Sequence, residues 1–130
     1  MIAKNNPFNI RCGSRWLGLS SSSKGFCEFE TLEYGVRAAC VLLLQSYRKK
    51  GVCRLSSIIS RFAPSVENDT QSYLDYVSNA TGLPKNLILT SDFQYANVLS
   101  SMAWFESHSR ISVSYILQII KKYNILLFNL

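Results

Sequence analysis

Glu106 is the residue whose position in the sequence best suits acid chemistry. It follows Leu99 by seven residues, Met102 by four and Ala103 by three. These spacings put it on the apolar face of a predicted helix, near the helix end. Lost hydration and the negative end of the helix dipole both raise a carboxyl pKa there. A glutamate that keeps its proton near neutral pH is what a glycosidase uses to protonate a leaving oxygen. The simpler alternative is that the helix ends and Glu106 turns to solvent.

A glycosidase that uses two acids needs a second carboxylate. Glu33, Glu67 and Asp69 stand at predicted helix starts, where the helix dipole favours negative charge. Glu28 and Glu30 have no such structural duty, and they share one face of a short strand predicted over 26–30. Either could stabilise an oxocarbenium ion or activate a water molecule. Exposed glutamates on a strand are equally an ordinary surface feature.

Other site chemistries find little support in the residue types. The four cysteines form no C-x-x-C pair and His108 is the only histidine, so we expect no metal site and no Cys–His catalytic pair. The chain has no glycine-rich phosphate loop and no dinucleotide fingerprint, and we therefore expect no cofactor. We interpret Cys12, Cys27, Cys40 and Cys53 as free thiols, mainly in the core or half-buried.

The composition is that of one ordinary globular domain over residues 1–130. Hydrophobic residues make up 48% of the chain and charged residues 17%, which suffices for a buried core. The net charge of +6 indicates an anionic partner such as nucleic acid, an anionic membrane or an anionic wall polymer. The largest basic run, Arg48–Lys50, is also typical of a solvated helix end. The apolar run at 38–44 is too short to span a bilayer, and the N-terminus lacks the apolar stretch of a signal peptide.

The hydrophobic pattern divides the chain into a loop and short-strand lobe at 1–30 and a helical lobe at 31–130. We expect the Ser20–Ser23 run at the tip of a hairpin that precedes the strand at 26–30. Helical spacing and capping residues then predict five helices, which cover 32–50, 55–62, 68–81, 92–106 and 112–123. In the fourth of these, Phe93 is expected to face inward together with Ala96 and Leu99. The predicted fold class is α+β, mainly α, with a small N-terminal hairpin region.

Several stretches, taken in order, resemble a known family. They are Asn5-Asn6-Pro7-Phe8-Asn9-Ile10-Arg11, Trp16-Leu17-Gly18, Gly25–Phe29, Glu33–Ala38, Ile59–Pro64, and Glu67-Asn68-Asp69-Thr70 with Tyr73. This ordered set covers roughly residues 5–106 and resembles phage- and prophage-encoded lysozyme-like proteins, some of which are virion structural proteins. It is also similar to bacterial glucosaminidases and lytic transglycosylases.

The resemblance implies a lysozyme-like fold that cleaves the glycan strands of peptidoglycan. It makes Glu106 the general acid and places Asn9 among the substrate-binding residues. Trp16, Phe26 and Tyr73 are candidates to line a sugar groove, because aromatic faces pack on sugar rings. Ordinary core packing explains each of these aromatic residues as well. Hydrolysis with a second carboxylate and a lytic transglycosylase reaction with one carboxylate both stay open.

The chain also departs from the pattern of that family. In the phage-type pattern the last helix ends in Glu-Asn-Gly, whereas here the glutamate is followed by Ser107 and His108. In transglycosylases and glucosaminidases the Glu-Ser helix comes first in the chain and here it comes late, which suggests a circular permutation. Arg54 stands where family members often carry a threonine cap. The alternative function is therefore a virion structural or wall-binding protein that kept the scaffold and lost the reaction.

The expected partners follow from these two functions. They are peptidoglycan and, for a virion component, other virion proteins. We expect no nucleic-acid partner, since no recognised motif supports the basic charge. We also expect no membrane span, a monomer, and a location in the cytoplasm of the producing bacterium or in the virion, without a signal peptide.

Overall fold

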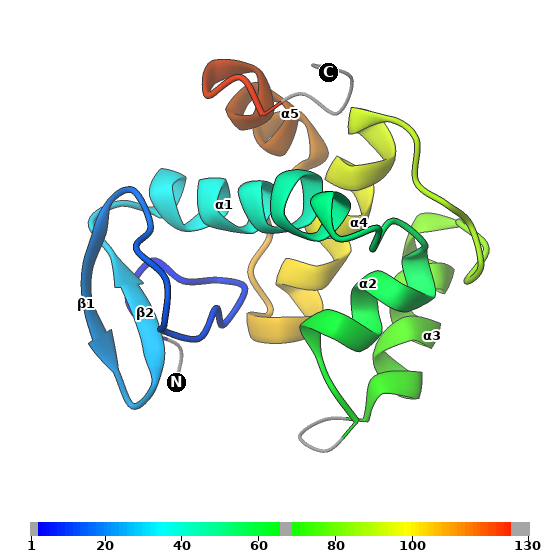
Figure 1. The fold of residues 1–130 in the computed structure, drawn as a ribbon, viewed down its shortest axis with the longest axis horizontal. Coiled ribbons are helices and arrows are strands. Elements are labelled where there is room, and N and C mark those ends of the chain that lie inside the picture. Colours follow the sequence, from blue (N-terminus) through cyan, green and yellow to red (C-terminus); the bar gives the residue numbers. More distant parts are fainter. Residues whose placement is uncertain (1–2, 66–68, 126–130) are drawn as a thin grey trace.

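The computed structural model describes residues 3–65 and 69–125 of the chain. Within these ranges a two-stranded hairpin, β1 (Leu19–Ser23) and β2 (Phe26–Phe29), is followed by five α-helices. Figure 1 shows the hairpin at one end of α1 (Leu32–Val41), with α2 (Leu55–Phe62) and α3 (Thr70–Thr81) beyond the other end. The predicted α+β, mainly α class is confirmed.

Helix α4 (Asp92–Ser107) forms the centre of the core. It packs against α3 on one side and against α5 (Val113–Lys122) on another. Its buried side chains point in several directions, which is typical of a helix enclosed by the rest of the protein; they include Tyr95, Ala96, Val98, Leu99, Met102 and Ala103. The prediction for Phe93 is wrong, because this side chain lies in the first turn and is 59% exposed.

The long helix predicted over 32–50 begins as expected at Thr31, whose hydroxyl accepts a hydrogen bond from the Tyr34 amide at 3.2 Å. From Leu42 to Tyr47 it continues as a π-helical segment, η1, before one last helical turn. The i→i+5 hydrogen bonding of a π-helix places an extra residue in each turn. Leu42 and Tyr47, five residues apart, therefore come toward the same side of the helix.

The other helix boundaries are set by local caps and nearby loops. The side chain of Arg54 does not cap α2. The first backbone amides of α2 bond to a nearby loop instead: the Leu55 amide donates to the Leu87 carbonyl at 2.8 Å, and the Ser56 amide donates to the Lys85 carbonyl at 2.9 Å. Helix α3 ends at Gly82 as expected, with a left-handed φ of 74°.

The start of α3 departs from the sequence-based expectation. The carboxylate of Asp69 accepts from the Ser72 amide at 3.1 Å and caps the helix. Asn68, where the predicted helix begins, lies outside the described residues together with Glu67.

The hairpin also corrects the sequence analysis. Ser20–Ser23 lie in β1 and not at its tip. The tip is formed by Lys24 and Gly25, which both have positive φ values, 52° and 87°. Two consecutive residues of positive φ are what a tight type I′ hairpin turn requires, so the turn, and not the serine run, fixes the hairpin. Cys27 and Phe29 share the buried face of β2.

The N-terminal loop is held against β2 by two asparagines. Asn6 is fully buried, and its amide donates to the carbonyls of Ile10 and Cys27, each at 2.9 Å. Its side-chain oxygen accepts from the Ile10 amide at 2.9 Å, so all of these buried polar groups are satisfied. The carbonyl of Asn5 packs directly on Gly35 in α1, where no side chain would fit. These contacts fix the loop that carries Asn9 and Arg11.

Among the helices in the described part of the chain, none combines the length and the apolar character that crossing a membrane requires.

Candidate functional site

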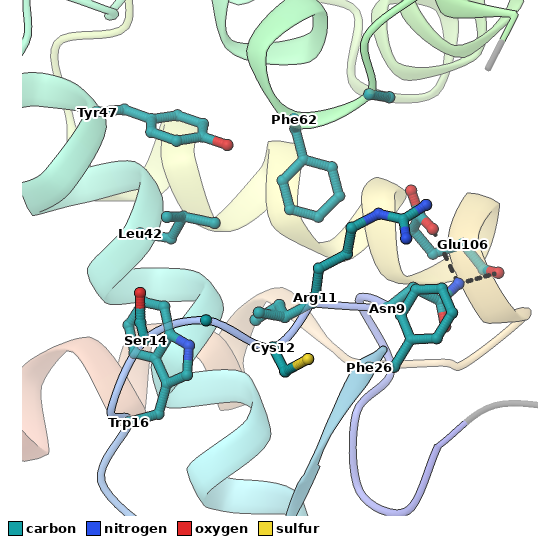
Figure 2. Close-up of a pocket in the computed structure, with 13 residues that line it drawn as sticks. Asn9, Arg11, Cys12, Ser14, Trp16, Phe26, Leu42, Tyr47, Phe62 and Glu106 are labelled. Carbon is teal, nitrogen blue, oxygen red and sulfur yellow. Dashed lines mark hydrogen bonds between the residues drawn. The ribbon is translucent and has the colours of Figure 1, made fainter. Parts of the chain in front are cut away.

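A cleft of about 370 Å³ lies where the N-terminal loop meets β2, η1, α2 and the end of α4. Figure 2 shows side chains from all five segments facing this space. Its lining combines aromatic and aliphatic groups with a few polar ones, as ligand-binding clefts commonly do: Asn9, Ile10, Arg11, Cys12, Gly13, Ser14, Trp16, Phe26, Leu42, Tyr47, Phe62, Ala63 and Glu106.

Glu106 lies at the rim of this cleft in the last turn of α4 and is half-buried. The amide of Asn9 donates to the carboxylate Oε1 at 2.9 Å and to the Glu106 backbone carbonyl at 3.1 Å. Both contacts are visible in Figure 2. Asn9 has a left-handed φ of 53°, and the contacts made by Asn6 support the loop in that conformation. One asparagine thus holds both the backbone and the side chain of Glu106.

The end of α4 is fixed independently of Asn9. His108 has a left-handed φ of 56° and terminates the helix, with its amide donating to the Trp104 carbonyl at 2.8 Å. The hydroxyl of Ser107 donates to the carbonyl of Pro7 at 2.7 Å. The helix end and the N-terminal loop are therefore joined at two neighbouring points, and Glu106 lies between them.

Burial raises the pKa of Glu106 above its ordinary value. The Asn9 hydrogen bond, the Tyr73 hydroxyl and the positive charge of Arg11 act in the opposite direction and lower that pKa. A carboxyl group in these surroundings retains its proton to higher pH than an exposed one. The same neighbours stabilise the carboxylate once the proton has left. The arrangement can therefore donate a proton to a bound oxygen and take one back.

Tyr73 lies behind Glu106 and not on the wall of the cleft. The side chain is 1% exposed, and its ring stacks on Phe105 with centroids 4.1 Å apart. Its hydroxyl lies close enough to Glu106 to affect the pKa but completes no hydrogen bond of ordinary geometry. Burial raises the pKa of Tyr73 well above the usual value, so the phenol is neutral. Its ring is inaccessible to a ligand, unlike the groove position expected from sequence.

Trp16 and Phe26, the other two expected aromatic residues, do line the cleft. They lie toward different ends of it, with Phe26 near Asn9 and Glu106 (Figure 2). The guanidinium of Arg11 lies 5.0 Å from the centre of the Phe26 ring. The indole N–H of Trp16 is buried without a hydrogen-bond partner.

Glu28 and Glu30 do not join Glu106. The carboxylate of Glu28 accepts from the Ser21 hydroxyl at 2.7 Å and faces the backbone amide of Lys4 at 3.5 Å, while Glu30 is exposed. Among the described residues that line the cleft, Glu106 is the only acidic one. The strand ends at Phe29, so Glu30 lies just beyond it, and neither glutamate is among the residues that line the cleft.

Sequence reasoning missed three residues that the fold brings to the cleft. Arg11 follows Asn9 in the N-terminal motif, and its proximity to that motif was the available signal. Tyr47 reaches the cleft through the π-helical segment, and Phe62 through the last turn of α2. Both lie in helices that the sequence predicts, but helical spacing alone does not mark either of them as a cleft residue.

The thiols differ in their surroundings. All four cysteines are free; Cys27 and Cys40 are buried, Cys53 is half-buried and Cys12 is exposed at the cleft. The prediction of free thiols mainly in the core or half-buried is therefore confirmed, with Cys12 as the exposed exception. No group of three or more histidine, cysteine or acidic side chains is placed to hold a metal ion in the described part of the chain.

Comparison with known proteins places the chain in a phage lineage. No model of an established protein family matches it. It is 38% identical over 114 residues to Protein P5 of Pseudoalteromonas phage PM2, an alignment that covers 83% of this chain and 71% of that protein. The shared length includes most of both chains and therefore exceeds a local motif. The chain belongs to the family of phage protein P5.

Proposed function

We propose that this protein cleaves the glycan strands of peptidoglycan and that Glu106 is its general acid. The observation that carries the proposal is a half-buried carboxyl of raised pKa at the rim of a cleft with aromatic walls. This combination suits protonation of a glycosidic oxygen, because the acid keeps its proton until a leaving group needs it. The ordered motifs that resemble lysozyme-like proteins support the same substrate.

A single carboxylate favours the lytic transglycosylase reaction over hydrolysis. In that reaction Glu106 gives its proton to the glycosidic oxygen, and the bond from that oxygen to the anomeric carbon breaks. The anomeric carbon belongs to a muramic acid residue. The resulting Glu106 carboxylate then takes the proton from the primary hydroxyl of that residue, and the hydroxyl oxygen bonds to the anomeric carbon to close an anhydro ring. The acid is regenerated without a second carboxylate. Asn9, Tyr73 and Arg11 would stabilise the ionised form between the two steps.

The remaining cleft residues supply binding groups for a sugar chain. Phe26 and Trp16 offer aromatic side chains at the cleft wall on which sugar rings can pack. The late position of the Glu106 helix in the chain remains explicable by circular permutation of a lysozyme-like fold, since Glu106 does reach a cleft. The alternative is a virion component that keeps this scaffold without turnover, and membership of a phage protein family favours it as the second candidate.

The test is release of soluble muropeptides from purified sacculi. The wild-type protein should release them, Glu106→Gln should not, and Glu30→Gln should behave as wild type because Glu30 is exposed away from the cleft. Products that end in an anhydro sugar would support the one-carboxylate reaction, whereas reducing ends together with an inactive Glu28→Gln variant would contradict it. A wild-type protein as inactive as Glu106→Gln would overturn the enzyme and favour the virion component.

A further inference from the structure

A second pocket of about 580 Å³ lies on the other side of α4, between α3, α4 and the loop that leads to α5. Its lining is rich in hydroxyl and amide groups: Tyr76, Ala80, Asn97, Ser100, Ser101, Trp104, Ser109, Arg110, Ile111 and Ser112. Figure 1 shows α4 between α3 and α5, and the loop at 108–112 joins α4 to α5. The volume is within the range that small-molecule and short-peptide sites occupy.

The floor of this second pocket is polar where the helix core is otherwise apolar. Ser101 is 8% exposed and is one of two buried polar residues, with Asn6, in the described part of the chain. The hydroxyls of Ser101 and Ser100 donate to the carbonyls of Val98 and Ile111, at 2.7 and 2.6 Å. Their donors are used within the protein, so the lone pairs of their oxygens are left for a ligand's N–H or O–H groups.

The wall of the second pocket carries one positive charge on an aromatic platform. The guanidinium of Arg110 lies 4.6 Å from the centre of the Trp104 ring, and His108 meets that ring edge-on at 4.9 Å. No acidic residue is among the described lining residues, so Arg110 gives the pocket a positive sign. A guanidinium is the group that best pairs with a planar carboxylate, because it can donate two parallel hydrogen bonds.

We propose that the second pocket binds a short peptide with a free carboxylate, paired by Arg110, whose amide groups meet the serine oxygens. This inference deepens the proposed function and rests on it, because the peptide stem of peptidoglycan has this chemistry. Trp104 and Glu106 are two residues apart and so point to opposite sides of α4. Phe105 lies between them, 39% exposed, and contacts Tyr76 of the second pocket at 5.5 Å between ring centroids. A glycan at Glu106 and the stem peptide in the second pocket would therefore lie on opposite sides of the end of α4, with Phe105 between them.

The test measures binding by calorimetry in the Glu106→Gln protein, which keeps the ligand intact. The probes are a free stem tetrapeptide, the same peptide with its carboxylates amidated, and a chitooligosaccharide. The tetrapeptide should bind, and Arg110→Gln should weaken it about tenfold or more, since a charge-assisted pair is lost. Lys49→Gln removes an equal charge from an exposed site outside the pocket and should change nothing.

A second variant keeps the charge and fills the space. Ala80 is an exposed residue of α3 at the pocket wall, and leucine is a good helix former, so Ala80→Leu should fold normally and still weaken the peptide. Chitooligosaccharide binding should be the same in both variants. Tetrapeptide affinity that is unchanged in Arg110→Gln, undetectable in the parent, or equal for the amidated peptide would overturn the proposal. Peptide binding does not depend on turnover. Inactivity on sacculi would therefore refute the proposed enzymatic function, while the binding data alone would decide whether the second pocket binds the peptide.

Discussion

Gly35→Ala should damage both the stability of the protein and the geometry of the cleft. A Cβ at this position would overlap the carbonyl oxygen of Asn5 and lie 3.1 Å from its carbonyl carbon and 3.5 Å from the Phe29 ring. The neighbours are backbone and a fully buried ring, neither of which can rotate away. The N-terminal loop must therefore move off α1, and Asn9, which holds Glu106, is part of that loop.

The size of the effect follows from three terms. Overpacking of this kind costs about 1–3 kcal/mol. Losing the hydrogen bond from the Asn5 amide to the Phe29 carbonyl, now 2.9 Å, costs about 1 kcal/mol more. Alanine is a better helix former than glycine by about 1 kcal/mol, which offsets part of the loss. We expect the free energy of unfolding to fall by about 1–3 kcal/mol, which lowers Tm by roughly 4–11 °C in a domain of this size.

Thermal and urea unfolding would measure the loss, and Gly51→Ala is the matched control. Gly51, unlike Gly35, has a positive φ, 75°, but nothing lies within 4 Å of a Cβ placed there. It should cost only the strain of the left-handed backbone, about 1 kcal/mol, without affecting activity on sacculi. Gly35→Ala should lose activity even at temperatures where it is fully folded. Wild-type stability in Gly35→Ala would refute the close approach of the loop to α1.

Three further predictions concern single side chains at the cleft and in the core. Because burial raises the pKa of Glu106 above its unfolded value, the folded chain binds that proton more tightly, and stability is lost as pH rises from the unfolded toward the folded pKa. Glu106→Gln cannot ionise, so its free energy of unfolding should exceed that of the wild type at neutral pH and equal that of the wild type near about pH 3. If the two proteins differ in unfolding free energy by the same amount at both pH values, the burial of Glu106 is contradicted. Asn9→Ala removes a hydrogen bond that lowers the pKa of Glu106, so the titration of Glu106, followed by NMR, should move to higher pH than in wild type. Iodoacetamide should modify exposed Cys12 in the native protein but spare Cys40, because Cys40 is fully buried and burial raises its pKa to about 12. Mass spectrometry of the digested protein would measure both modifications, and faster modification of Cys40 would contradict the prediction.

Local sequence patterns predicted the helices well because caps and apolar spacing are properties of neighbouring residues. Thr31, Ser91 and Ser112 each accept a hydrogen bond from a backbone amide in the first turn of the helix that follows. The same patterns failed where packing decides the outcome. Phe93 fits the apolar stripe of α4 but lies in the first turn, beyond the helices that cover the rest of the stripe. The hairpin tip was predicted at the serine run, but Lys24 and Gly25 form it. Their positive φ values are a property of the backbone that a hydrophobicity pattern does not contain.

The candidate site was only partly readable for the same reason. The sequence by itself determined that Glu106 lies near a helix end on an apolar face, because helical periodicity needs only the preceding turns. Only the tertiary structure decided that Asn9, 97 residues away in the chain, holds this carboxylate, and that Tyr73 supports it from behind. The tertiary structure likewise decided that the Glu28 carboxylate bonds to Ser21 and does not face the cleft. Contacts between distant segments depend on how helices and loops pack together, and a one-dimensional pattern carries no information about that packing.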